Sequence, residues 1–196
     1  MSNPNPCQTA NQDPMKEYTE FVDLCFKNKS EVVFPNFDVR HGVVILRAIF
    51  ENAKKKVRVF CNSLHHDAWG DKILQTKIED ALEREVEIYI ITQNECDKEV
   101  SCFFRGKADK GMVIYESKFK EKEYNFVVAD DDKYRAELKP QTDARKAIAC
   151  AKGKGFAKDL IDKFDRMVVE IHANENFSKK VSDKVQARSL LARKLA

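Results

Sequence analysis

The sequence predicts one α/β domain whose mixed, largely parallel sheet is flanked by helices, with an N-terminal arm and a basic C-terminal helix. Three observations carry this prediction. Amphipathic patterns alternate with short apolar runs between residues 43 and 93, which is the spacing of a right-handed, parallel βαβ unit. Two strand-like runs flank an acidic turn at residues 130–132, which predicts a hairpin. A strongly periodic helix closes the domain, as is typical of α/β folds.

The N-terminal part divides at residue 13. Residues 1–13 are polar and rich in Asn, Pro and Gln, so we expect a disordered leader. Asp13 followed by Pro14 resembles an N-cap and a first helical position, and apolar residues at helical spacing extend this helix to residue 27. The next apolar run contains Pro35, which predicts an edge strand or an extended arm that completes residues 14–37.

The α/β domain is expected over residues 38–175, followed by a basic tail at 176–196. The predicted elements alternate along the chain and end in a hairpin, one more extended run and a closing helix. They are helices at 43–56, 71–85, 98–108 and 155–172, strands at 57–64, 86–93, 111–117 and 144–153, and a hairpin at 123–139.

Charge is placed unevenly along a chain whose net charge is only +3. Residues 177–196 carry six basic side chains against one acidic side chain, a local charge of +5 that leaves −2 on the remainder. A basic segment on a near-neutral body suits contact with phosphates, although a solvated helix end is the alternative. The candidate nucleic-acid contacts are Lys179, Lys180, Lys184, Arg188, Arg193 and Lys194.

Cysteine usage and hydropathy indicate a cytoplasmic protein. Six cysteines are scattered without a CxxC pair, which is typical of reduced side chains and not of a disulfide framework or a zinc site. The chain opens on polar residues, and no apolar run has the length needed to cross a membrane. We therefore expect no membrane insertion, and the sequence predicts no bound cofactor.

The acidic hairpin holds most of the candidate binding side chains. Residues two apart in a strand share a face, and a two-residue turn at 131–132 sets Asp130 opposite Lys133. In that register, Asp130, Arg135 and Glu137 lie on one face. A structural ion pair is the alternative to a binding site for such a group.

A second candidate group follows the first predicted parallel strand, where loops at carboxyl ends carry function. His65, His66 and Asp67 lie there. Together with Asp130 or Asp131 they predict a divalent metal site, or a histidine of this loop acts as a nucleophile or base, and a solvated loop is the alternative. A magnesium nuclease site built on Asp130 and the Glu-x-Lys triplet at 137–139 is a further possibility. Neither ligand set is complete enough to predict a bound metal.

The order of these elements over residues 38–172 resembles a single phospholipase D-like domain. The resemblance rests on ILRAIFENAKKK, VRVFCNSL, KILQTKIEDALERE, VEIYIITQ, YNFVVADD, YRAELK and GFAKDLIDKFDRMV. Active members carry His-x-Lys and, after four more residues, Asp. In them the histidine is the nucleophile that takes the phosphoryl group, and the lysine holds the phosphate.

This sequence departs from that motif at two of its three positions. With Asp130 in the aspartate slot, Glu123 occupies the histidine slot and Asn125 the lysine slot. A carboxylate offers no nitrogen nucleophile and repels an anionic phosphodiester, and the lost lysine removes a cationic partner for the phosphate. The downstream small-polar pattern of active members is also absent from RAELKPQT. The resemblance therefore implies the fold without its usual chemistry.

We expect a non-catalytic binding protein that recognises a polyanion such as nucleic acid, or a partner protein. The resemblance also implies a homodimer, because single-copy members of the family often pair. Degenerate domains of this kind occur in phage-defence modules, which gives one biological context. The alternative is a phosphodiesterase or nuclease whose rearranged active site uses His65, His66 and Asp130. The candidate ligand-binding residues are Glu123, Asn125, Asp130, Arg135 and Glu137.

Overall fold

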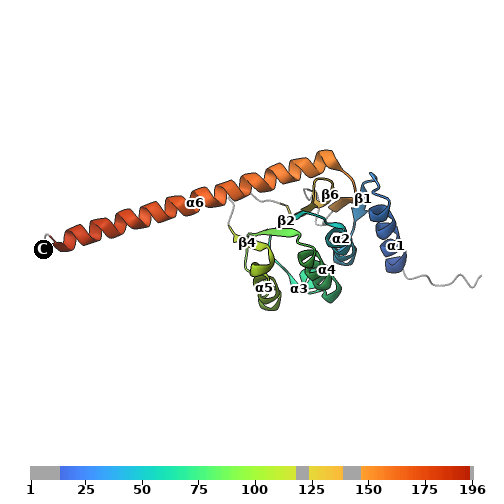
Figure 1. The fold of residues 1–196 in the computed structure, drawn as a ribbon, viewed down its shortest axis with the longest axis horizontal. Helices are drawn as coiled ribbons and strands as arrows, with labels where there is room; N and C mark the ends of the chain where they lie inside the picture. Colours follow the sequence, from blue (N-terminus) through green and yellow to red (C-terminus); the bar gives the residue numbers. More distant parts are fainter. Residues whose placement is uncertain (1–13, 118–123, 139–146, 195–196) are drawn as a thin grey trace, which may run out of the picture.

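The computed structural model describes residues 14–117, 124–138 and 147–194, with side chains to residue 174. Within these residues a seven-stranded sheet has the long helix α6 on one face and the shorter helices on the other (Figure 1). The elements are α1 (Pro14–Lys27), β1 (Phe34–Asn36), α2 (Val39–Asn52), β2 (Lys56–Cys61), α3 (His66–Trp69), α4 (Lys72–Glu83), β3 (Glu87–Thr92), α5 (Lys98–Arg105), η1 (Ala108–Lys110), β4 (Met112–Glu116), β5 (Phe126–Ala129), β6 (Lys133–Glu137), β7 (Ala147–Cys150) and α6 (Lys154–Lys194).

The strand order is β1-β7-β6-β5-β2-β3-β4. The expected fold class, a mixed α/β sheet flanked by helices, is confirmed, but its parallel part is smaller than expected. Only β2–β3 and β3–β4 pair in parallel, and the other four pairings of the described strands are antiparallel. The tight turn that joins β5 and β6 accounts for the antiparallel pairing of these two strands.

The predicted βαβ unit is formed by β2, α4 and β3. Lys56 lies beside Glu87 at the start of the parallel pair and Cys61 beside Thr92 at its end. Asp71 caps α4 by accepting a hydrogen bond from the Leu74 N–H at 2.7 Å. Strands β2 and β3 therefore end on the same side of the sheet, and Lys56 lies on the opposite side, where both strands begin.

The β5–β6 hairpin differs from its expected register by one residue. Ala129, and not Asp130, lies opposite Lys133, because the turn contains three residues and Asp130 adopts a left-handed conformation with φ of 54°. Asp130 therefore belongs to the turn, and Arg135 pairs with Val127. Arg135 and Glu137 share a face of β6 as expected, but the placement of Asp130 on that face is wrong.

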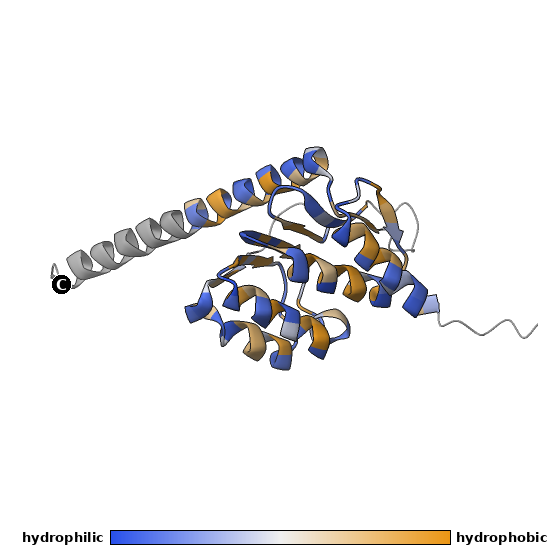
Figure 2. Cartoon of the chain, turned by 45° about the vertical axis from the view of Figure 1, so that its right-hand side comes forward, coloured by the Kyte–Doolittle hydropathy of each residue, from blue (hydrophilic) through white to orange (hydrophobic). Residues whose placement is uncertain are grey.

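Two apolar cores lie on the two faces of the sheet, and Figure 2 shows hydrophobic and hydrophilic residues alternating along the helices that cover it. Ile45, Ile49 and Ile78 are fully buried between the sheet and helices α2 and α4. On the opposite face, the rings of Phe60 and Phe126 stack 5.5 Å apart beneath α6. The sheet is thus covered on both faces, so candidate functional groups are expected at the ends of its strands.

Helix α6 runs from Lys154 to Lys194 and projects well beyond the body (Figure 1). It continues through residue 175, where the sequence suggested a boundary, because no glycine or proline follows Gly155 to interrupt it. The basic side chains expected at residues 179–194 lie outside the described side chains. Among the described residues, no helix combines the length and apolarity required to span a membrane.

Candidate functional site

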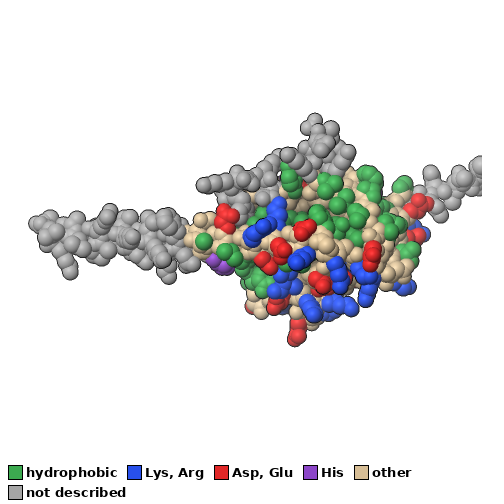
Figure 3. Space-filling model, turned by 90° about the horizontal axis from the view of Figure 1, so that it is seen from above, with side chains coloured by type: hydrophobic (Ala, Val, Ile, Leu, Met, Phe, Trp, Pro, Cys, Tyr) green, Lys and Arg blue, Asp and Glu red, His purple; other side chains and the backbone are tan. Residues whose placement is uncertain are grey.

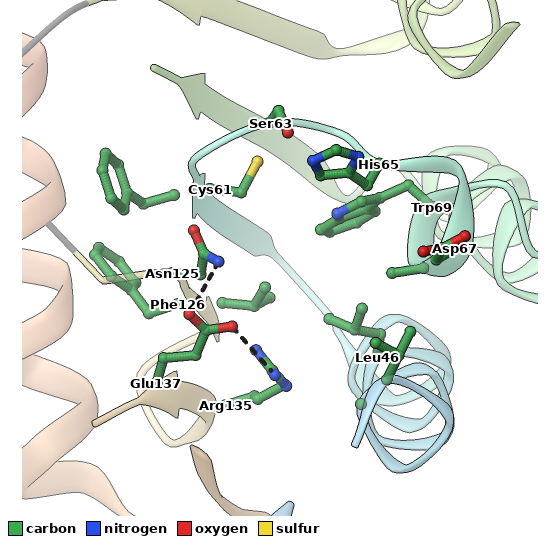
Figure 4. Close-up of a pocket in the computed structure, with 15 residues that line it drawn as sticks. Leu46, Cys61, Ser63, His65, Asp67, Trp69, Asn125, Phe126, Arg135 and Glu137 are labelled. Atoms are coloured by element: carbon green, nitrogen blue, oxygen red, sulfur yellow. Dashed lines mark hydrogen bonds and ion pairs between the residues drawn. The ribbon is translucent and has the colours of Figure 1, made fainter. Parts of the chain in front are cut away.

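A cavity of about 270 Å³ lies at the edge of the sheet where β2 ends (Figure 4). Its walls come from α2, β2, α3, β5 and β6 and from the loops beside them. Ligands of open α/β sheets bind outside the carboxyl ends of parallel strands, so the cavity occupies the edge at which a site is expected. Its polar lining consists of Ser63, His65, Asp67, Asn125, Arg135 and Glu137.

A chain of polar contacts runs across this edge of the sheet. Arg135 Nε donates to Asn36 Oδ1 at 2.6 Å, and Arg135 Nη2 lies 3.6 Å from Glu137 Oε1. The second carboxylate oxygen of Glu137 accepts a hydrogen bond from the Asn125 amide at 3.0 Å. Asn125 Oδ1 in turn accepts one from the Asn62 N–H at 2.7 Å. The two dashed contacts in Figure 4 show how Glu137 lies between Asn125 and Arg135.

The Arg135–Glu137 pair is largely withdrawn from solvent, since the two side chains are 15% and 17% exposed. Removing one partner from such a pair leaves a desolvated charge, so the pair is held as a unit. Gly42 of α2 permits its close packing: a Cβ there would lie 3.3 Å from Asn36 Oδ1 and 3.5 Å from Arg135 Nε. The polar side chains of the cavity wall therefore bind one another, and the positive charge of Arg135 is paired with Glu137.

The histidine loop contributes only one of its two histidines to the cavity. His65 lines the wall, its side chain is 71% exposed, and its Nδ1 lies 3.9 Å from Asp97 Oδ2. His66 begins α3, donates its backbone N–H to Asp97, and is not part of the cavity lining. Of the two adjacent histidines, His65 therefore lines the cavity and His66 does not, and Asp67 lies in the cavity wall with His65.

Three further groups on the cavity wall bear on its chemistry. Burial raises the pKa of the Cys61 thiol, so it stays protonated and is not a nucleophile. The Ser63 hydroxyl oxygen is buried without a hydrogen-bond partner among the described residues. Trp69 presents one side to the cavity, while its ring packs edge-on against Phe50 and Phe104. The wall therefore combines apolar surface with a hydroxyl group that a ligand can satisfy.

Asp130 lies at the opposite edge of the sheet, where β2 begins. Its carboxylate accepts hydrogen bonds from the backbone N–H groups of Lys54, Lys55 and Lys56 at 2.8–3.3 Å. Its second oxygen accepts one from Lys133 Nζ at 2.9 Å. Asp130 thus joins the β5–β6 turn to the loop that precedes β2, which is a structural role.

Opposing effects act on the pKa of Asp130. Burial raises the pKa of the carboxyl, but the hydrogen bonds from Lys133 and from the backbone amides of Lys55 and Lys54 outweigh burial and lower it below its ordinary value. For Lys133, burial lowers the pKa, and the hydrogen bonds to Asp132 and Asp130 together raise it above its ordinary value. Both groups are therefore held in their charged forms.

The structure brings together three of the candidate ligand-binding residues, Asn125, Arg135 and Glu137, and adds His65 to them. It does not bring Asp130 to the same edge, so His65 and Asp130 of one chain do not form a joint site. Glu123 lies outside the described residues, as do the six basic side chains of the tail. Among the described residues, no group of three or more His, Cys, Asp or Glu side chains is arranged to hold a metal ion.

Sequence reasoning missed Asn36, Asn62 and Ser63. Asn36 is 99 positions from Arg135 in sequence, and the two meet because β1 pairs with β7 and β7 pairs with β6. A local signal existed for the other two, because Asn62 and Ser63 directly follow the buried strand β2. Polar residues at that position predict a functional edge.

Comparison with known proteins supports the fold and adds no sequence relative. No protein-family model matches the chain, and no curated protein matches it. Solved structures do match. The archaeal chromatin protein TrmBL2, whose structure shows a novel mode of DNA binding, aligns with a TM-score of 0.55 and 12% identity over 79% of this chain and 59% of its own.

Two further structures show the same likeness. Nuc from Salmonella typhimurium, a phospholipase D family member, aligns with a TM-score of 0.53 and 13% identity over 69% of this chain and 92% of its own. Polyphosphate kinase from Porphyromonas gingivalis aligns with a TM-score of 0.54 and 12% identity over 83% of this chain and 31% of its own. This chain thus spans little more than half of TrmBL2 and a third of the kinase. At these identities the likeness concerns architecture, and the chain has a phospholipase D-like fold.

Proposed function

We propose that this chain is a non-catalytic phospholipase D-like protein that binds nucleic acid and acts as a homodimer. One observation carries the proposal: the described residues at the motif positions are committed to structural hydrogen bonds. Asn125 joins Glu137 to the Asn62 backbone, and Asp130 holds the loop at the other edge. Neither side chain is placed to hold a phosphoryl group.

The electrostatics of the cavity argue in the same direction. Two carboxylates, Asp67 and Glu137, stand against one guanidinium, and Glu137 already occupies Arg135. Phosphoryl transfer needs cationic groups around the transferring phosphate and a nitrogen or oxygen nucleophile at its face. The sequence places Glu123 in the histidine slot, so the nitrogen nucleophile of active members is absent from that position, and the imidazole on the cavity wall is that of His65.

Nucleic acid is the polyanion that the observations favour. The basic residues at positions 179–194 give the chain the means to neutralise phosphates, and TrmBL2, with a similar fold, is a DNA-binding chromatin protein. The homodimer is proposed because the described residues form one phospholipase D-like domain, and proteins of that family with one copy often pair. Recognition of a partner protein is the competing outcome that the experiment below separates.

The test combines a turnover assay with a binding assay on the purified full chain. We expect no hydrolysis of bis(p-nitrophenyl) phosphate above buffer, with or without a chelator. We expect fluorescein-labelled duplex DNA to bind, and we expect the logarithm of the binding constant to fall linearly with the logarithm of the salt concentration. Turnover that disappears in His65→Ala would instead establish the enzyme with a rearranged site. No binding to DNA or RNA, with a protein co-purifying, would replace nucleic acid by a protein partner.

A further inference from the structure

A second hollow, of about 500 Å³, lies at the edge of the sheet opposite the cavity, where β2 begins. It is formed where the end of α1, the loop between α2 and β2, and the β5–β6 turn meet. We call it the lysine groove. Its charged lining consists of Lys29, Lys54, Lys55, Lys56, Arg58 and Lys133 with Asp130, Asp131 and Asp132.

Most of the charges in the lysine groove are already paired. Lys133 contacts Asp130 at 2.9 Å and Asp132 at 2.8 Å. Two further cations bind carboxylates outside the groove, Lys56 with Glu87 at 2.9 Å and Arg58 with Asp165 at 3.1 Å. These pairs neutralise the inner part of the groove, so its outer charges decide what it attracts.

The outer charges are predominantly positive. Lys29, Lys54 and Lys55 are exposed and have no ion-pair partner among the described residues, whereas Asp131 is the single exposed carboxylate of the lining. Three ammonium groups thus face solvent against one carboxylate. On the face of the body drawn in Figure 3, Lys and Arg side chains gather in one part with acidic side chains among them.

The positions of Lys54 and Lys55 are fixed by the backbone beneath them. Asp130 accepts hydrogen bonds from both of their N–H groups, at 3.2 Å and 2.8 Å. Because the carboxylate secures the main chain on its inner side, the two lysine side chains are left to extend into solvent. Lys29 lies in the turn that follows α1, with φ of 49°, and its N–H donates to the Phe26 carbonyl oxygen at 3.2 Å.

The end of α2 would normally oppose an anion here, since helix C-termini carry partial negative charge. In this chain the carbonyl groups at that end already bind a cation. Arg84 Nη2 donates to the carbonyl oxygens of Phe50 at 2.8 Å and Glu51 at 3.2 Å. The guanidinium therefore offsets the negative end of the helix next to the lysine groove.

We propose that the lysine groove binds the phosphodiester backbone of nucleic acid, with Lys29, Lys54 and Lys55 as the phosphate contacts. This inference rests on the proposed function and assigns it a surface, away from the cavity and separate from the C-terminal basic segment. Flexible ammonium groups contact phosphates as point charges, and Phe26, the aromatic ring of the groove lining, is buried. Binding through this surface is therefore independent of sequence.

The experiment compares two double variants of the full chain that change net charge equally. Lys54→Gln/Lys55→Gln removes two proposed contacts, and Lys98→Gln/Lys110→Gln removes two exposed lysines that do not line the groove. Anisotropy of labelled duplex DNA is measured from low to high salt. We expect the groove variant to lose affinity by tens of fold at about 0.1 M salt and its salt slope to fall by about 2. The control keeps the slope of the unaltered chain.

Each other outcome overturns the inference in a distinguishable way. If the unaltered chain binds DNA and both variants bind as it does, the groove is not the surface, while the proposed function stands. A chain lacking residues 177–196 that loses all binding, with the groove variant unchanged, likewise excludes the groove. No binding of the unaltered chain to duplex DNA, single-stranded DNA or RNA overturns the inference together with the proposed function. Lys29→Gln, expected to lower the slope by about 1, checks the third contact.

Discussion

At the residue scale, Asp130 shows how one motif residue can persist without its motif. Its carboxylate ties the turn after β5 to a backbone segment 74 residues or more away in sequence. Its side chain is 12% exposed, and its φ of 54° places it in a conformation that Asn and Asp tolerate better than most residues. Both the N–H donors that surround the carboxylate and the backbone geometry therefore favour aspartate at this position.

Replacing Asp130 should destabilise the fold. We expect Asp130→Asn to lower the free energy of unfolding by about 2 kcal/mol, because the amide loses the charge-assisted bonds to Lys133 and to the backbone N–H groups. Asp130→Ala should cost about 1 kcal/mol more, since alanine disfavours the left-handed conformation. Urea unfolding measures both, with exposed Asp131→Asn as the control. Equal stability of Asp130→Asn and Asp131→Asn would contradict the structural role.

The same carboxyl makes stability depend on pH. Because the folded pKa of Asp130 is lowered, the unfolded chain takes up the proton first as pH falls, and protonation favours unfolding. The contribution of Asp130 is therefore fully present above its unfolded pKa, about 3.9, and is lost as pH falls through the lower folded value. We expect the stability difference between the unaltered chain and Asp130→Asn to be constant from pH 7 to 5 and to shrink below pH 4. A difference that grows on acidification would reverse the assigned sign.

At the scale of elements, helices α2 and α4 are joined by a two-point contact. Arg47 of α2 donates to both carboxylate oxygens of Asp71 at 3.0 Å and 2.7 Å, and Asp71 also caps α4. Burial raises the pKa of Asp71, but the hydrogen bonds from Arg47 and from the Leu74 amide outweigh burial and lower it. The contact therefore orients the helix that connects the parallel strands.

A double-mutant cycle should resolve this contact. We expect Asp71→Ala to cost about 2 kcal/mol, from the lost cap and the lost ion pair, and its coupling with Arg47→Met to be about 1 kcal/mol. The Lys77–Glu51 pair links the same two helices at 2.7 Å but leaves Glu51 51% exposed, so its coupling should stay below about 0.5 kcal/mol. Urea unfolding of the two cycles gives both values, and equal couplings would show that the paired geometry adds nothing.

The sequence predicted the elements wherever local pattern decides them. The βαβ unit at β2, α4 and β3 follows from alternating periodicity, and Pro35 indicated the strand that occupies one edge of the sheet. The hairpin register was not predictable from alternation, because alternation is equally satisfied by a two-residue turn. The left-handed Asp130 lengthens the turn by one residue, and its conformation depends on contacts with a distant loop.

At the scale of the whole molecule, the candidate site was predictable only in part. Asn125, Arg135 and Glu137 were found because the motif slots and the hairpin pattern lie close together in sequence. Their partner Asn36 and the cavity residue Ser63 were not found, since the order β1-β7-β6-β5-β2 that brings them together is set by tertiary pairing. The separation of Asp130 from His65 has the same origin.

The proposed homodimer is best tested at the carboxyl ends of β1 and β6. Asn36 and Glu137 are aligned across β7, both opposite Ala147, so Phe37 and Leu138 follow at the same edge. These two side chains are 70% and 41% exposed. Exposed apolar side chains grouped at one edge are typical of an interaction surface. We therefore expect this edge to form the dimer contact.

Sedimentation velocity at concentrations on the order of 10–100 µM measures the outcome, a range that detects Kd values typical of modest interfaces. We expect the unaltered chain to sediment as a dimer and Phe37→Asp/Leu138→Asp to sediment as a monomer. Each substitution would place two carboxylates in the contact, one from each subunit, and both would lose their water. The control is Ile73→Asp on α4, an element that contains neither Phe37 nor Leu138 and where the isoleucine is 55% exposed, and it should remain dimeric. A dimer that survives the double variant places the contact on another surface, whereas a monomeric unaltered chain removes the homodimer from the proposed function and leaves each lysine groove to bind nucleic acid alone.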